Sequence, residues 1–205
     1  MNNQENQNQS KQVVLSVLAV AILIVAVVGI SFAVFTFSQA GTKNNTIVTG
    51  SIKMTYTEGT NGINITNAMP MTDVAGKAQT GDGNIFDFTV ASTISGTATI
   101  NYEVAAVKAA ASTLADSDVR IYLEKKGEGD VYASVFAPAG FTATNASAAT
   151  AIGSPMGSMV LYSGTHTTSS TDSFRLRMWM AESAVVTGTS RTYTVTIDVN
   201  GKTTA

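Results

Sequence analysis

An uninterrupted apolar run near the amino terminus limits what this chain can be more than any other feature. Residues 13–30 read VVLSVLAVAILIVAVVGI, eighteen residues without a charge, and the apolar character continues to Phe37. A helix of about 20 such residues spans the hydrocarbon core of a bilayer. The run is apolar on every side, so it does not fit a surface helix packed on a soluble core. The sequence therefore predicts a hydrophobic N-terminal helix within residues 1–33 that contacts a membrane.

This segment has two membrane interpretations. Ser31-Phe32-Ala33 has the small-x-small pattern of a signal-peptidase site, which predicts cleavage between Ala33 and Val34, and residues 38–40 form a second candidate. The apolar run is longer than the ~7–15 residues usual in a signal peptide, which favours a retained anchor instead. Lys11 on the short N-terminal side favours a cytoplasmic amino terminus. Both interpretations place the rest of the chain outside the cytoplasm, extracellular or on the cell surface.

Beyond residue 45 the hydrophobic pattern changes to a period of two, which is typical of half-buried strands. Apolar residues alternate with polar ones around Met54, Phe88, Tyr102, Ile121 and Val199. Strands with polar outer faces indicate antiparallel sheets. Residues 45–205 are therefore expected to form an antiparallel β-sandwich, either jelly-roll or immunoglobulin-like, preceded by a linker or donor strand at 34–44. Weaker strands are expected at 62–65, 131–136 and 158–162, a short helix at 107–114, and a long surface loop at 137–158.

Composition removes several function classes. A net charge of −2 gives no basic patch for nucleic acid, and a chain without cysteine has no thiolate chemistry. The one histidine, His166, lies in the hydroxyl-rich segment 163–168, which predicts a solvated turn residue. No HExxH or GxSxG motif accompanies it. The pairs Asp116/Asp118 and Asp82/Asn84 do not continue into a twelve-residue calcium loop. We therefore expect no catalytic residue, cofactor or metal ion, and no enzymatic activity.

The segment from Arg175 to Met180 has the most distinctive composition. If Leu176 and the two methionines of this strand face the core, then Arg175, Arg177 and Trp179 share the outer face. Tryptophan and arginine are enriched at binding hot spots, so one interpretation is an exposed interface. The alternative is an ordinary outer face on which the tryptophan covers the sheet.

Two short blocks resemble the TasA/camelysin family of secreted biofilm-matrix proteins. The first is FTFSQAGTKNNTIVTGSI at residues 35–52, and the second is FDFTV at 86–90, followed by Ser95-Gly96. The likeness covers roughly residues 13–105. Residues 69–73 and 80–83 depart from the Pro-Gly-Asp turn of the family, and the 175–180 strand has no counterpart there. The resemblance implies a jelly-roll sandwich that polymerises into extracellular fibres, in which the N-terminal strand of one subunit completes the sheet of the next.

These observations predict a structural protein, secreted or on the cell surface, that self-associates into a matrix fibre or pilus. After cleavage at Ala33, Phe35 and Phe37 lie on one face of an extended segment that adds to an open sheet edge. The alternative from a different class is a single-pass, membrane-anchored adhesin or binding module. In both cases the membrane partner is the N-terminal segment, and nucleic acid is not a partner.

Overall fold

The computed structural model describes residues 17, 19–20, 36–40, 46–49, 52–186 and 188–204, with side chains at 17, 19–20 and from 52 onward. The predicted hydrophobic helix lies almost wholly outside these residues, as do Ala33, Val34 and Phe35. For Phe37 only the backbone is described. Those expectations therefore stay predictions. Within the described ranges, no helix is both long and apolar enough to cross a membrane.

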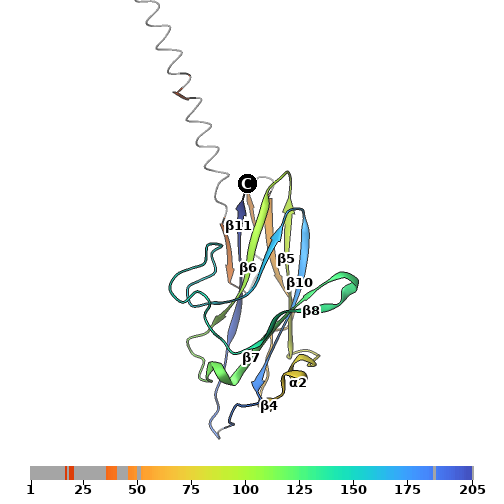
Figure 1. Ribbon diagram of the computed structural model, residues 1–205, viewed down its shortest axis with the longest axis vertical. Helices are drawn as coiled ribbons and strands as arrows, with labels where there is room; N and C mark the ends of the chain where they lie inside the picture. The colour runs from red at the N-terminus through yellow and green to blue at the C-terminus, as the bar shows by residue number, and fades with distance from the viewer. Residues whose placement is uncertain are drawn as a thin grey trace, which may run out of the picture.

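Two β-sheets packed face to face form the body of the molecule (Figure 1). The four-stranded sheet contains, in spatial order, β1 (Thr36–Ala40), β11 (Val195–Thr204), β6 (Thr99–Lys108) and β9 (Met159–His166). The seven-stranded sheet contains β2 (Thr46–Thr49), β3 (Ile52–Glu58), β5 (Ile85–Ile94), β10 (Ser170–Ala181), β7 (Val119–Lys126) and β8 (Tyr132–Ala139), with β4 (Pro70–Met71) beside β10. Strand pairs are antiparallel except β4–β10, which is parallel. The expected all-β antiparallel sandwich is confirmed.

Three short helical elements occur within the described residues from 52 onward. The helix α2 (Asp73–Lys77) begins after Thr72, whose hydroxyl accepts a hydrogen bond from the Ala75 amide. It follows β4 and lies on the outer face of the seven-stranded sheet. Two 3₁₀ turns, η1 (Asp116–Asp118) and η2 (Glu128–Asp130), precede and follow β7.

The period-two pattern places the large apolar side chains between the sheets. Phe88, Ile100, Tyr102 and Leu176 are each 3% exposed or less, as expected, and Val195 packs against the same core. Phe88 lies at the centre of an aromatic group. Its ring centroid is 5.2 Å from that of Phe174, 5.6 Å from Phe86 and 5.7 Å from Tyr56. These ring contacts stabilise a specific packing geometry, in addition to burying apolar surface.

Three local expectations are wrong. Residues 107–114 form no helix, because β6 continues through Lys108, which pairs with Val195 of β11. Sheet pairing here overrides the helix propensity of the alanines. Residues 62–65 form no strand, and the loop expected at 137–158 begins later, because β8 runs to Ala139. The two weaker strands around 131–136 and 158–162 are confirmed as β8 and β9.

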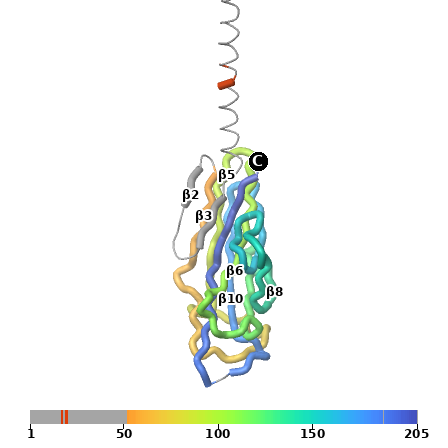
Figure 2. Tube along the Cα trace, turned by 90° about the vertical axis from the view of Figure 1, so that its left-hand side faces the viewer, coloured from red at the N-terminus to blue at the C-terminus, as the bar shows by residue number. Residues whose placement is uncertain are grey.

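The first two described strands lie on the edges of different sheets. β1 pairs with β11 from Thr36 opposite Lys202 to Ala40 opposite Asp198, whereas β2 pairs with β3. Figure 2 shows β3, the partner of β2, at one side of the sandwich. Each of these strands has one hydrogen-bonded neighbour among the described residues.

Phe88→Ala is expected to lower the free energy of unfolding by about 3–5 kcal/mol, because it removes buried surface and leaves a cavity. Thr89→Ala is the matched control on the same strand. Thr89 is half-buried and points away from this aromatic group, so its loss is expected to cost about 1 kcal/mol or less. Urea denaturation of both variants measures the difference. Equal losses would contradict the assigned faces of β5.

Candidate functional site

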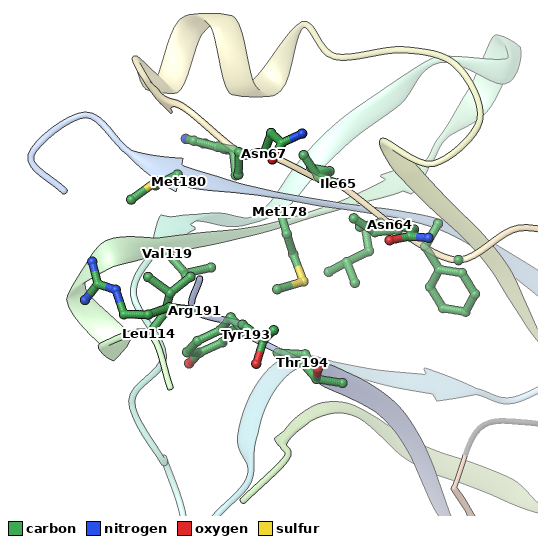
Figure 3. Close-up of a pocket in the computed structure, with 18 of the residues that line it drawn as sticks. Asn64, Ile65, Asn67, Leu114, Val119, Met178, Met180, Arg191, Tyr193 and Thr194 are labelled. Atoms are coloured by element: carbon green, nitrogen blue, oxygen red, sulfur yellow. The ribbon is translucent and has the colours of Figure 1, made fainter. Parts of the chain in front are cut away.

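A cavity of about 890 Å³ opens between the sheets, near the start of β11 and the end of β10 (Figure 3). Most of its lining comes from the end of β10, the loop at 59–68, and residues 186 and 188–197, with further residues from other strands and loops. Its apolar surface comes from residues such as Leu176, Met178, Leu114, Val119 and Ile65. The cavity is therefore the hollow end of the same apolar layer that is filled with aromatic rings further along the sandwich.

Two polar side chains that line this cavity, Tyr193 and Arg191, are held by neighbouring groups. The Tyr193 hydroxyl donates to Asp116 Oδ1 at 2.6 Å, and burial together with this hydrogen bond raises the pKa of Tyr193, which stays neutral at physiological pH. Arg191 donates to the Val185 carbonyl at 2.9 Å and lies 3.7 Å from Asp118. Arg191 and Glu58 are the charged residues among the described ones that line the cavity. Such a lining suits binding of a partly apolar ligand better than acid–base chemistry.

Arg175 lies on the outer face of its sheet, as the strand pattern predicts. Its guanidinium forms two hydrogen bonds of 2.8 Å with the Asp87 carboxylate, and its charged carbon lies 4.2 Å from the Tyr132 ring centroid. The hydrogen bonds with Asp87 raise the pKa of Arg175, so its guanidinium stays charged. The side chain is 25% exposed.

Trp179 and Arg177 share this face, but the expectation that they form an exposed interface is wrong. Trp179 is 2% exposed and Arg177 is 6% exposed. The indole lies beneath Gly76 of α2, where a Cβ would come within 2.2 Å of its ring. Arg177 forms an ion pair with Glu124 and donates to the Gln79 carbonyl at 2.9 Å. The segment that connects β4 to β5 covers both side chains, which strand periodicity alone does not reveal.

The expected position of His166 in a solvated turn is also wrong. It ends β9, is 5% exposed, and points into the core instead of lying in a solvated turn. Its Nδ1 lies 2.5 Å from Ser92 Oγ and its Nε2 lies 3.0 Å from Asp172 Oδ2. Asp172 also accepts a hydrogen bond from Tyr102 and forms a 2.8 Å ion pair with Lys125. The group joins both sheets, since His166 and Tyr102 belong to one and the other three residues to the second.

Serine, histidine and aspartate in line have the composition of a hydrolytic triad. Here Ser92 is 5% exposed, and none of the three residues lines the cavity. A nucleophile must reach its substrate, so this buried arrangement fits a structural bridge between the sheets. In the first acidic turn considered for calcium, Asp116 accepts hydrogen bonds from Lys108 and Tyr193, and Asp118 lies near Arg191. In the second, the Asn84 amide donates to the Thr80 carbonyl.

Comparison of the chain with models of protein families, with curated proteins and with solved structures found no match in any of the three.

Gly76→Ala is expected to displace α2 from Trp179. Alanine is normally favoured over glycine inside a helix by about 1 kcal/mol, but the new methyl group has no space above the indole. Because Trp179 is the only tryptophan, its fluorescence emission reports on the contact and should shift to longer wavelength. Val74→Ala is the control, since Val74 belongs to the same helix and is 76% exposed. Unchanged emission from Gly76→Ala would contradict the docking of α2.

Asp172→Asn is expected to lower the free energy of unfolding by about 3 kcal/mol at pH 7, because it leaves Lys125 without its partner. Burial alone would raise the pKa of Asp172, but hydrogen bonds from Lys125, Tyr102 and His166 outweigh it and lower the pKa. The stabilisation is therefore present above the unfolded value of about 3.9 and is lost as pH falls through the lower folded value.

The difference in the free energy of unfolding between wild type and Asp172→Asn should thus become smaller below about pH 4. Urea denaturation at pH 7 and pH 3 measures this narrowing. Asp82→Asn, in an exposed turn, is the control and should change little at either pH. A difference that stays constant between the two pH values would argue against the ionised bridge.

Proposed function

We propose that this chain is a non-enzymatic subunit of an extracellular matrix fibre or pilus that assembles by donation of its N-terminal strand. The observation that carries the proposal is the position of β1. It is the first strand on its sheet, it lies at the edge, and it covers only Asp198–Lys202 of the longer strand β11. A short terminal strand on a longer edge is an element that a neighbouring subunit can replace without rearranging the core.

The strand order supports a jelly-roll connectivity for the sandwich. Along the chain the strands run β1, β5, β6, β7, β8, β9, β10 and β11, with β2–β4 as additions. The four-stranded sheet then places the first, eighth, third and sixth strands side by side, and the other sheet the second, seventh, fourth and fifth. This is the order of two Greek keys wound into a jelly roll. In such a fold β1 is one of the basic strands, so a sandwich without it is one strand short.

An incomplete sheet explains why donation would be favourable. If β1 leaves its own β11, the exposed backbone groups of β11 require another strand, and an incoming β1 from a second copy restores the same pairs. The exchange is head-to-tail and does not close, so it generates a filament. The resemblance of residues 13–105 to the TasA/camelysin family supports the same assembly. The burial of Ser92 supports the absence of enzymatic activity.

A chain that begins at Val34 is expected to form filaments visible by negative-stain microscopy, whereas Phe35→Asp with Phe37→Asp is expected to remain monomeric. Two charges on the donated face would have to be buried beside β11. Thr60→Asp with Asn61→Asp is the control, since it adds the same charge in an exposed loop. Filaments from the Phe double variant, or a monomeric Val34 chain at high concentration, would contradict the proposal.

The absence of cysteine permits a direct test of strand exchange. Thr36 and Lys202 are opposite each other in the β1–β11 register, so Thr36→Cys with Lys202→Cys places two thiols within reach of a disulfide. Oxidised filaments should give a covalent ladder on a non-reducing gel if β1 comes from a neighbour. A monomer with an internal bridge would show that β1 stays on its own sheet.

The second candidate, a membrane-anchored binding module, is favoured by the position of the cavity. The cavity lies at the start of β11, whereas Thr36 at the start of β1 lies beside Lys202 near its end. A segment anchored before Thr36 would therefore leave the cavity on the far end of the domain. N-terminal sequencing of the mature protein separates the candidates. A start at Val34 or Gly41 supports the fibre subunit, and an intact Met1 supports the anchor.

A further inference from the structure

Three polar side chains gather on the outer face of the four-stranded sheet. In β11, Val199 points into the core and a Cβ on Gly201 would meet Met54, so Asp198 and Asn200 point the other way. In β6, Glu103 lies between the core residues Tyr102 and Val104 and therefore shares that outer face. Asn200 is directly opposite Glu103 in the strand register, and directly opposed side chains have Cβ atoms about 5 Å apart.

Asp198 and Asn200 are buried although they face outward, and Glu103 is half-buried. Asn200 is 0% exposed and Asp198 is 7% exposed. Within the part of the chain that the structure describes, Asn200 Oδ1, Asn200 Nδ2 and Asp198 Oδ1 are buried without a hydrogen-bond partner. Buried polar groups are almost always satisfied by protein, water or an ion, because leaving them unpaired costs free energy. The cluster therefore has polar atoms that could bind a ligand, and no described group satisfies them.

The loop at 140–158 closes over this face. Thr150 Oγ1 and Ser154 Oγ donate to Glu103 Oε2 at 2.5 and 2.7 Å, and Ser154 is 0% exposed. Hydrogen bonds within the loop hold it together. The Thr150 backbone amide donates to the Ser154 carbonyl, and the Gly153 amide donates to both the carbonyl and the Oγ1 of Thr150. Figure 1 shows it in teal on the side of β6 and β11 away from β10. A preformed cover of hydroxyl groups thus lies next to the carboxylate.

We propose that this cluster binds a calcium ion between β6 and β11. The carboxylates of Glu103 and Asp198 and the Asn200 Oδ1 atom are its ligands, and the hydroxyls of Thr150 and Ser154 complete the site from the loop. Calcium takes six to eight oxygen ligands in irregular geometry, whereas magnesium requires a near-octahedral set and keeps several waters. A site built from carboxylate, amide and hydroxyl oxygens on two strands and a loop matches the calcium preference.

The charge balance points the same way. Two carboxylates share this face, and the next outward residue on β11, Lys202, forms no ion pair with any described residue. In the described ranges, no group of three or more acidic, histidine or cysteine side chains could by itself hold a metal ion. The third ligand of this site is therefore an amide oxygen.

The test uses the full chain, purified in mild detergent and treated with a chelator. Calcium titration by calorimetry is expected to give one site with a dissociation constant below about 1 mM, the weak end of extracellular calcium sites. Saturating calcium should raise the thermal midpoint by roughly 5 °C. Asp198→Asn, which keeps the shape of the side chain, should weaken binding at least tenfold and remove this shift.

Asp130→Asn is the matched control, because it removes the same charge from a side chain that is 84% exposed. It should bind calcium like wild type. Without calcium, Asp198→Asn should unfold at the same temperature as wild type or higher, since it no longer buries an unpaired charge. This readout separates loss of the site from loss of the fold. No binding by wild type, equal binding by Asp198→Asn, or tighter binding of magnesium than of calcium would overturn the proposal.

Discussion

The carboxylate of Asp172 fixes how the two sheets of this sandwich meet. Apolar packing drives the sheets together but is non-directional, so by itself it does not determine their alignment. Asp172 on β10 receives Tyr102 and His166 from the opposite sheet and Lys125 from the neighbouring strand β7, and His166 extends the contact to Ser92 on β5. These directional contacts tie five strands to one oxygen-rich point. The aromatic layer around Phe88 and Phe174 then fills a gap whose geometry is already set.

The two ends of the sandwich differ because of this bridge. Asp172 lies near the start of β10, where ionic and hydrogen-bonded contacts close the interior, whereas the cavity lies near the end of the same strand. Along β10 the space between the sheets thus passes from a polar bridge through stacked rings to an open hollow. The outer face of β10 is protected too, since α2 and the segment after it cover Trp179 and Arg177. A central strand covered on both faces is a stable support for the other strands of its sheet.

Sequence periodicity predicted the sheets and the inward residues, because alternation is a local property of each strand. It also predicted the outward direction of Trp179, but not its burial, which depends on a helix about a hundred positions earlier in the chain. The hydroxyl residues around His166 predict a turn. The local pattern misses its contact with Asp172, because the chain reverses direction between the two residues. The alternating pattern predicts that Asp198 and Asn200 face solvent. No residue near them in the sequence indicates that the loop at 140–158 covers their face. The helix expected at 107–114 fails for a similar reason, because pairing with β11 outweighs alanine propensity.

The direction of β1 has a mechanical consequence. Its first residue, Thr36, lies beside Lys202 near the end of β11, and the strand then runs back along β11 to Asp198. A pull on the chain preceding Thr36 acts along the axis of β1 and loads its cross-strand hydrogen bonds together in shear, instead of peeling them apart one at a time. Tension is thereby shared along the strand and passed to β11, and from there to β6 across a ladder that runs from Val195–Lys108 to Thr204–Thr99. The β1–β11 ladder therefore resists a pull that enters before Thr36 when the opposing force acts at the far end of the sandwich.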